Sequence, residues 1–377
     1  MASIQSSEIS GIRDKLPDVE ARRTLVDQIR DTVRFVLPPI ARVAVVTDGR
    51  SGLTHLYGRR TWPLPKDRSG VYTGPYPANE GDAIAQVETV RQEGAQFLLI
   101  PRTAFWWLDY YEGFRRHLAS SYRVAFRDET CMIIALHHEL DPPHTGDAPD
   151  GLPMPPPELM SMVTGSFSAR AYWEGGEITS GWIRKILSSN GFDMESFEHI
   201  LDFGCGCGRV MRYWKDLSNP ALSGADYNPY LVRWCRHNLP FADFQRVGDL
   251  KPLQYEDETF DLIYAYSVFT HLDLVSERFW IEELQRLLRP GGIMYLTLRG
   301  QRYAEVLTPE ERERFDAGEM VVQEEKVSGS NACLAHHPES YVREQLAPGL
   351  EVVDYVPSDE AGEKADPWLD VVVFRKD

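Results

Sequence analysis

The stretch Leu201-Asp202-Phe203-Gly204-Cys205-Gly206-Cys207-Gly208-Arg209 decides the fold. An apolar run enters three alternating glycines, and a helix is expected to start at Arg209. Glycine permits a tight turn and lets a ligand lie directly on the backbone, because no Cβ intrudes. The amino terminus of a helix favours polar or anionic ligand groups. The spacing G-x-G-x-G argues against a nicotinamide-binding loop, which prefers G-x-G-x-x-G; a purely structural glycine turn is the other alternative.

Apolar strands alternate with helices on the carboxyl side of this loop. This alternation predicts an α/β fold with a mostly parallel sheet that is covered on both faces. Such sheets bind ligands at the carboxyl ends of their strands. The expected strands are 199–204, 221–226, 244–249, 260–267 and 293–299. One helix is expected to start at Arg209, a second at Pro229, and a third to cover residues 276–288. Two late strands, 350–356 and 370–376, are expected to form a closing antiparallel pair.

Four further motifs follow the glycine loop in order. They are Gly224-Ala225-Asp226, Asp249-Leu250, Phe260-Asp261-Leu262-Ile263-Tyr264 with the segment 267–272, and Leu287-Leu288-Arg289-Pro290-Gly291-Gly292. Together the five motifs resemble class I S-adenosylmethionine-dependent methyltransferases, strongly over residues 165–300 and less specifically beyond. The resemblance implies a Rossmann-like, mostly parallel seven-stranded sheet and S-adenosyl-L-methionine as the cofactor.

The resemblance also implies which residues hold the cofactor. Asp202 and the turn of Gly204, Gly206 and Gly208 would hold its amino-acid end, Asp226 the ribose hydroxyls, Asp249 and Leu250 the adenine, and Tyr266 or Ser267 the methionine moiety. Cys205 and Cys207 fill the variable positions of the loop. They are interpreted as small buried fillers, with metal or redox chemistry as the alternative; no metal site is predicted.

Two histidines are candidates for the base that an alcohol acceptor needs as its oxygen is methylated. His271 follows the strand 260–267 and is the first candidate; ordering the loop beside the cofactor is its alternative role. His337, in the segment 330–338, is the second candidate, and a plain loop is its alternative. A metal site at His336 and His337 is conceivable but is not favoured.

The segment 166–181 precedes the first strand of the expected sheet, where the family often builds a helical lid. Tyr172 and Trp173 are therefore expected to cover a small acceptor, with a helix packed on the sheet as the alternative.

Composition excludes several function classes. The 377 residues carry 40 Lys+Arg against 57 Asp+Glu, a formal charge of −17. Nucleic acid is therefore an improbable partner, because its phosphates are usually met by a basic surface. No run of apolar residues is long enough for a membrane span. Five unpaired cysteines and a polar start indicate reduced thiols and a cytoplasmic location.

A proline-rich stretch, residues 139–158, is interpreted as a linker between a small α/β domain (1–138) and the methyltransferase domain (159–377). The first domain is similar to those that accompany bacterial glycan-biosynthesis enzymes. The similarity rests on residues 43–48, 58–63, 74–77 and 105–108. Its tryptophans, Trp62, Trp106 and Trp107, would either stack on a sugar or belong to the core.

The sequence thus predicts O-methylation of a sugar or glycan-precursor hydroxyl. An N- or O-methyltransferase of a small natural product, or a non-catalytic cofactor-binding scaffold in glycan assembly, are the alternatives. The expected partner is a small-molecule or glycan acceptor, and a homo-oligomer or a glycan-assembly partner enzyme stays open.

Overall fold

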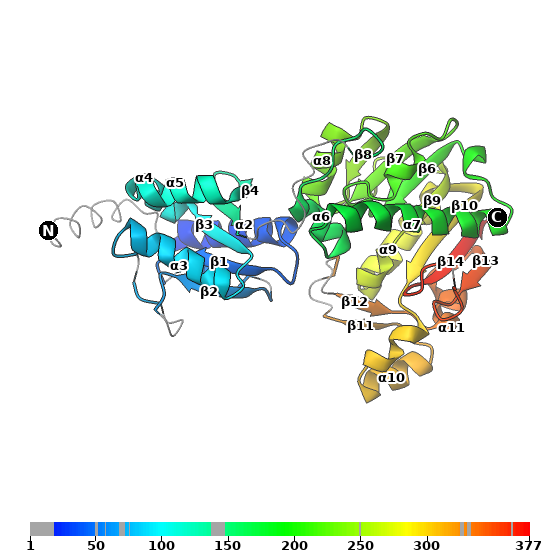
Figure 1. The fold of residues 1–377 in the computed structure, drawn as a ribbon. Helices are drawn as coiled ribbons and strands as arrows, with labels where there is room; N and C mark the ends of the chain where they lie inside the picture. The colour runs from blue at the N-terminus through cyan, green and yellow to red at the C-terminus, as the bar shows by residue number, and fades with distance from the viewer. Residues whose placement is uncertain are drawn as a thin grey trace. The chain divides into compact units, whose positions relative to one another are not determined.

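The computed structural model divides the chain into two compact units, Met1–Pro143 and His144–Asp377 (Figure 1). The structure describes residues 19–49, 52–56, 58–67, 72–74, 76–136, 148–248, 250–324, 328–329, 333–362 and 365–377. Each unit has its own sheet and its own hydrophobic core.

The first unit is a five-stranded sheet in the order β2-β1-β3-β5-β4. β1 is parallel to both of its neighbours, whereas β5 is antiparallel to β3 and β4. β4 and β5 form a hairpin, and Asp128 Oδ1 closes its turn by accepting from the backbone N–H groups of Thr130 and Cys131. The strands are β1 (Arg42–Val46), β2 (Arg60–Leu64), β3 (Phe97–Pro101), β4 (Arg123–Arg127) and β5 (Cys131–Ala135); the helices are α2 (Val19–Val36), α3 (Glu80–Gln92), α4 (Trp106–Tyr110) and α5 (Glu112–Ser121).

Two features of this unit depend on its tertiary structure. β2 contains Pro63, which cannot donate to a ladder; the strand is nevertheless formed because it lies at the edge of the sheet. The aromatic-rich segment that follows β3 forms two helices, α4 and α5, because Tyr111 leaves the helical region at φ −97° and ψ 81°. Trp62 and Trp107 are buried in the core, as the structural alternative for them required.

The second unit is a seven-stranded sheet in the order β13-β14-β10-β9-β6-β7-β8, mostly parallel as predicted. β14 alone runs antiparallel to its neighbours, β10 and β13. The strands are β6 (His199–Phe203), β7 (Ala221–Asp226), β8 (Ala242–Arg246), β9 (Phe260–Ala265), β10 (Leu288–Leu298), β13 (Leu350–Val356) and β14 (Asp370–Lys376). A separate antiparallel pair is formed by β11 (Val321–Gln323) and β12 (Leu334–His336).

Alternate residues of each central strand belong to two different cores. Ile200 and Tyr295 pack with α6 (Pro157–Thr164), α7 (Ala169–Ser189) and α8 (Pro229–Asn238), whereas Leu201 and Leu296 pack with α9 (Leu274–Leu287). The sheet is therefore buried on both faces, and its functional groups can emerge only at strand ends.

The helix expected from Arg209 is reduced to a single 3₁₀ turn, Met211–Trp214. Arg212 within it is fully buried and fixes the end of the proline-rich stretch. Its guanidinium donates to both carboxylate oxygens of Asp150, each at 2.8 Å, and to the carbonyl oxygens of Leu152 and Pro153 at 3.1 and 3.0 Å. From Asp150 to Pro153, then, the segment expected as a linker is held by the second unit.

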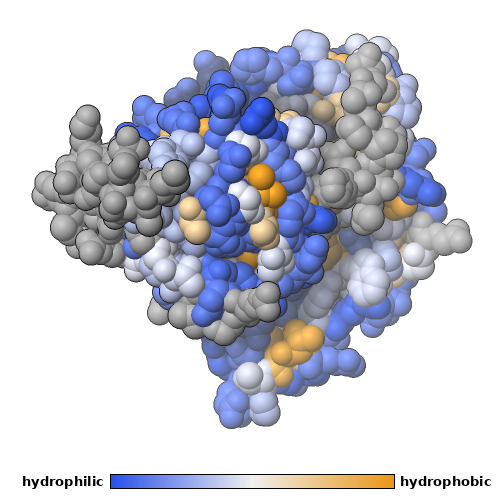
Figure 2. Space-filling view, turned by 60° about the vertical axis from the view of Figure 1, so that its left-hand side comes forward, coloured by the Kyte–Doolittle hydropathy of each residue, from blue (hydrophilic) through white to orange (hydrophobic). Residues whose placement is uncertain are grey.

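The surface in Figure 2 is mostly hydrophilic, and its orange patches are small and separated. Among the helices that the structure describes, none is both long enough and apolar enough to cross a bilayer.

Candidate functional site

The glycine loop joins β6 to the 3₁₀ turn through three residues with positive φ, Gly204 (83°), Gly206 (57°) and Gly208 (74°). L-residues with a side chain rarely adopt this backbone region. Space is also restricted: a Cβ on Gly206 would lie 2.7 Å from Cγ2 of Val163. The loop therefore needs glycine for both its conformation and its packing.

Asp226, the last residue of β7, is bonded directly to this loop. Its Oδ2 accepts from the backbone N–H of Gly206 at 2.8 Å, and its Oδ1 accepts from that of Asn228 at 2.7 Å. Burial raises the pKa of Asp226 to about 6, although the two backbone hydrogen bonds oppose the shift. The carboxylate thus stands where β6 and β7 end side by side.

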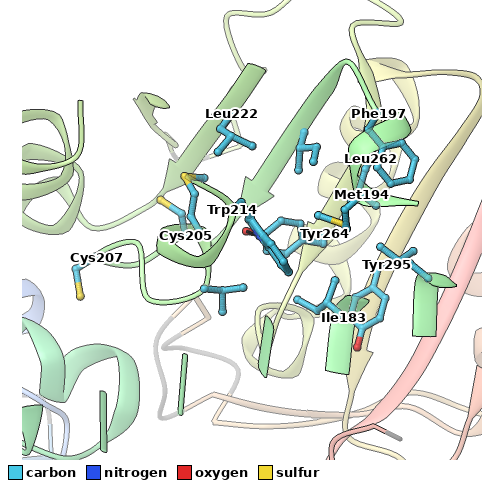
Figure 3. Packing of buried hydrophobic residues seen from close by; sticks show 14 of the residues in the cluster. Ile183, Met194, Phe197, Cys205, Cys207, Trp214, Leu222, Leu262, Tyr264 and Tyr295 are labelled. Carbon is cyan, nitrogen blue, oxygen red and sulfur yellow. Dashed lines mark hydrogen bonds between the residues drawn. The ribbon is translucent and has the colours of Figure 1, made fainter. Parts of the chain in front are cut away.

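Asp202 is buried on the α7 side of the sheet and belongs to a short hydrogen-bonded chain. Nε1 of Trp214 donates to the Tyr264 hydroxyl at 3.1 Å, and that hydroxyl bonds to Asp202. Figure 3 shows the rings of Trp214 and Tyr264 next to each other. Burial raises the pKa of Asp202 to about 7; Tyr264 opposes the shift and the nearby Asp226 adds to it. A buried carboxylate of this kind favours a cationic ligand group.

Tyr266 and Ser267 follow β9 at the same edge of the sheet. Ser267 has φ 58°, and its backbone N–H donates to Thr297 Oγ1 at 2.7 Å. The Tyr266 hydroxyl donates a short hydrogen bond to Asp366, and the guanidinium of Arg209 lies 5.7 Å from the centre of the Tyr266 ring. Tyr266 thereby links the glycine loop to the segment between β13 and β14.

His271 lies in a short 3₁₀ turn after β9, and Nδ1 of its ring is 2.7 Å from the carbonyl oxygen of Cys333. Because a carbonyl can only accept, Nδ1 carries the proton and Nε2 keeps its lone pair. Burial lowers the pKa of His271 to about 4, so the ring is neutral near pH 7. A neutral imidazole with a free Nε2 lone pair has the protonation state that a general base requires.

His337 is in a different environment, and its expected role as a second base is wrong. The ring is fully buried, with Nε2 at 2.7 Å from Oε2 of Glu277, while the Tyr341 hydroxyl donates to Oε1 at 2.6 Å. Glu277 is itself buried in α9. His337 therefore fixes the segment after β12 to α9, and its other ring nitrogen, Nδ1, is buried without a hydrogen-bond partner among the described residues.

Tyr172 and Trp173, the pair expected to cover the acceptor, lie in different environments in α7. Tyr172 is fully buried, and its hydroxyl donates to the carbonyl oxygen of Cys207 at 2.8 Å. This hydrogen bond fixes the glycine loop from within the core, so the expectation that Tyr172 covers an acceptor is wrong. Trp173 is only partly buried and lies 5.1 Å from the ring of Tyr213.

The predicted adenine residues have different outcomes. Asp249 lies outside the described residues. Leu250 is exposed and adopts φ 45°, so its place beneath an adenine ring stays a prediction.

All five cysteines are buried free thiols. Cys207 Sγ lies 3.8 Å from the carbonyl oxygen of Leu159, and Cys235 Sγ lies 3.4 Å from that of Gly206. Burial raises the pKa of Cys207 above its ordinary value. No group of three metal-ligating side chains occurs among the residues that the structure describes.

Sequence reasoning missed Asp366 and Thr297, which fix the residues after β9. Asp366 lies one hundred positions beyond Tyr266 and carries no motif. A threonine inside an apolar strand was the only available signal for Thr297.

Part of the second unit is similar to known methyltransferases. Residues 201–296 match the family model described as a methyltransferase domain. Phthiotriol/phenolphthiotriol dimycocerosates methyltransferase 1 of Mycobacterium ulcerans is 38% identical over 108 residues, which are 28% of this chain and 39% of that protein. Malonyl-[acyl-carrier protein] O-methyltransferase of Enterobacter lignolyticus is 29% identical over 101 residues, which are 27% and 39% of the two chains. The chain thus spans about two fifths of the length of these curated relatives.

A solved S-adenosylmethionine-dependent methyltransferase from Mesorhizobium loti is similar at 16% identity and a TM-score of 0.40, covering 52% of this chain and 98% of that one. The fold assignment here stands on the strand order itself. The family match and the curated names support an S-adenosylmethionine-dependent methyltransferase, as the five motifs predict. Residues 201–296 of this chain therefore carry a methyltransferase domain.

Proposed function

We propose that this chain transfers the methyl group of S-adenosylmethionine to an oxygen of its acceptor, a hydroxyl of a sugar or glycan precursor. The observation that carries the proposal is the position of Asp226, with its carboxylate bonded to Gly206 where β6 and β7 end. A carboxylate at this point accepts hydrogen bonds from both hydroxyls of a ribose. The glycine loop beside it admits a ligand against the backbone.

The cofactor's own charges fit the surrounding residues. Asp202, buried and with a raised pKa, would be neutralised by the α-ammonium group of the cofactor. Gly204, Gly206 and Gly208 would receive its amino-acid end, and Tyr266 and Ser267 would border the methionine moiety. Bound there, S-adenosylmethionine supplies an electrophilic methyl group on a sulfonium.

The residues of this chain would contribute to catalysis in two ways: they would position the acceptor against the cofactor, and one of them would accept a proton. Holding the acceptor oxygen in line with the methyl carbon is worth about 7–11 kcal/mol in well-oriented reactions. His271, with Nδ1 fixed on Cys333, would take the acceptor's hydroxyl proton at Nε2 as the new O–C bond forms and the S–C bond breaks. The ring would end as an imidazolium and lose its proton to solvent.

A methyltransferase of a small natural product or lipid is the second candidate. The curated relatives favour it, because their names describe phthiotriol dimycocerosates and malonyl-acyl-carrier protein as acceptors. The first unit, with its own sheet, would then serve as an acceptor-recognition or docking domain, as it would for a glycan.

Calorimetric titration of the purified chain with S-adenosylmethionine and S-adenosylhomocysteine tests the cofactor assignment, with nicotinamide dinucleotide as the control. Micromolar binding of the first two ligands, and none of the third, is expected. No binding to a demonstrably folded sample would contradict the proposal and favour a non-catalytic scaffold. Methyl transfer to sugars, glycolipids and small natural products would then separate the two acceptor classes.

A further inference from the structure

The carboxyl end of β10 carries a cationic side chain that has no acidic partner in the part of the chain that the structure describes. Arg299 follows β10 directly and is paired with His336 of β12 in a parallel bridge, and its carbonyl oxygen accepts from the His337 N–H at 2.8 Å. Figure 1 shows β12 beside the end of β10. Among the described residues, no carboxylate lies within ion-pair distance of the Arg299 guanidinium, and its buried Nε has no hydrogen-bond partner.

His336, next to Arg299, is also unsatisfied. It is fully buried, and neither ring nitrogen has a hydrogen-bond partner within the described part of the chain. The Tyr303 ring contacts both residues: the Arg299 guanidinium lies 4.9 Å from its centre, and its centre is 6.4 Å from that of the His336 ring. Arg299 Nε and both ring nitrogens of His336 are thus unsatisfied within the described residues, and both side chains lie against the same aromatic ring.

Leaving these groups unpaired is costly, because a buried polar nitrogen without a partner loses the hydrogen bonds it made in water. Glu311 is the acidic group whose charge reaches His336, but its Oε2 already accepts from the Thr308 N–H and the Gln323 side chain. Arg299 also acts electrostatically on His271, so the cluster stands beside the proposed base. Native proteins rarely leave such groups unsatisfied, and a functional role or a bound ion is among the explanations for those that are.

We propose that Arg299 and His336 bind an anionic group, a carboxylate or a phosphate, on the acceptor that is methylated. The two-pronged guanidinium of Arg299 can donate to two oxygens of either anion. The neutral imidazole of His336 can donate one further N–H hydrogen bond to the same anionic group. The inference rests on the proposed function and narrows its acceptor: the hydroxyl to be methylated belongs to a molecule that also carries a negative charge.

Three hexose derivatives that share the glucose ring and differ in the group at C6 test this assignment. Glucose 6-phosphate, glucuronate and glucose are titrated into the full chain saturated with S-adenosylhomocysteine. One or both charged sugars are expected to bind about tenfold more tightly than glucose or better, since a charge-assisted pair discriminates by at least that factor. Which of the two binds more tightly separates a phosphate acceptor from a carboxylate acceptor.

Substitutions of Arg299 test whether the preference for charged sugars comes from Arg299 and His336. Arg299→Gln is expected to abolish the preference for charged sugars while S-adenosylhomocysteine binds as before. Arg299→Lys, which keeps the charge but not the fork, is expected to reduce it, and this variant decides the matter if Arg299→Gln does not fold. Arg302→Gln is the matched control, because Arg302 is exposed and lies 4.5 Å from the Trp368 ring.

Equal binding of the three sugars, including binding of none, would overturn the inference, as would a preference that survives unchanged in both Arg299 variants. The cofactor titration on the same sample keeps the two proposals apart. If S-adenosylhomocysteine does not bind, but the charged sugars titrated into the chain alone still bind more tightly than glucose, the proposed function alone is contradicted.

Discussion

The carboxylate of Asp226 accepts a hydrogen bond from the backbone N–H of Gly206 at 2.8 Å, across the gap between β7 and the loop after β6. The two strands are already in register through the pair Phe203 and Ala225. This extra bond holds the loop at the point where a ribose and the amino-acid end of the cofactor would meet. Asp226 therefore has two roles, one in shaping the loop and one in accepting from the ligand.

Replacing Asp226 by Ala is expected to weaken S-adenosylmethionine binding by about 1–3 kcal/mol, because the ribose hydroxyls lose their acceptor. Calorimetry on the folded variant measures the loss. Asp216→Ala is the control, since Asp216 is exposed beside Lys215. An unchanged affinity in Asp226→Ala would refute the ribose assignment.

The raised pKa values of Asp202 and Asp226 predict how the stability of the ligand-free protein depends on pH. Burial raises the folded-state pKa of Asp202 to about 7 and of Asp226 to about 6. At these two positions the folded protein therefore binds more protons than the unfolded chain, and their contribution to stability falls as pH rises through about 4 to 7. Asp202→Asn is expected to match wild type at about pH 4 and to melt at a higher temperature at about pH 8.

Thermal unfolding of wild type and variant across this range measures the effect. His271 and His336 have lowered pKa values and act in the opposite sense, but they do so equally in both proteins. Parallel melting profiles for wild type and Asp202→Asn would show that Asp202 is ionised in the folded state.

His271→Ala is expected to lower turnover by about 10²–10⁴-fold with little loss of cofactor affinity, if the ring is the base. The pKa of about 4 also predicts that the acidic limb of the wild-type rate lies near pH 4 rather than 6.5. Methyl transfer measured against pH with a saturating acceptor checks both statements. Wild-type turnover in the variant would exclude His271 from the mechanism.

His337→Gln is expected to act on stability and not on chemistry. Glu277 loses its 2.7 Å partner in a buried site, which costs about 1–3 kcal/mol. Urea unfolding measures this loss, and turnover per folded molecule should stay at the wild-type value. His237→Gln, at an exposed position of α8, serves as the comparison. A large fall in turnover of folded His337→Gln would restore a catalytic role for this histidine.

Asp150→Ala is expected to destabilise the protein by about 3–5 kcal/mol, because it leaves the buried guanidinium of Arg212 without its carboxylate. The double variant Asp150→Ala with Arg212→Met should recover much of that loss, since no unpaired charge remains. Urea unfolding of the single and double variants measures both. A single variant as stable as wild type would mean that the pair contributes nothing to the fold.

The local sequence was sufficient for the parts of the fold that depend on local chemistry. The glycine loop and the apolar strands around it follow from glycine conformation and strand periodicity. Local reasoning is not sufficient where contacts between residues far apart in the sequence determine the backbone conformation. Pro63 is tolerated because β2 is an edge strand, and Tyr111 interrupts a helical pattern while its hydroxyl donates to the carbonyl oxygen of Pro77.

The candidate site shows the same division. Asp202 and Asp226 stand at strand ends that motif spacing identifies, so their positions were predictable. The burial of His337 against Glu277, sixty residues away, was not, because no local pattern shows which face of a later segment meets α9. Arg299 was not predicted as a site residue for a related reason: an arginine after a strand is unremarkable in the sequence, and only the structure shows that no described carboxylate pairs with it.

The order of strands at one side of the large sheet makes the sheet's assembly non-sequential. β13 precedes β14 in the chain, yet it reaches the sheet only through β14, which lies between it and β10. A chain cut before residue 370 would therefore lose two strands instead of one. The apolar edge of β10 would then be open to pairing with other chains, so shortening the protein at this end should produce aggregates rather than a smaller folded enzyme.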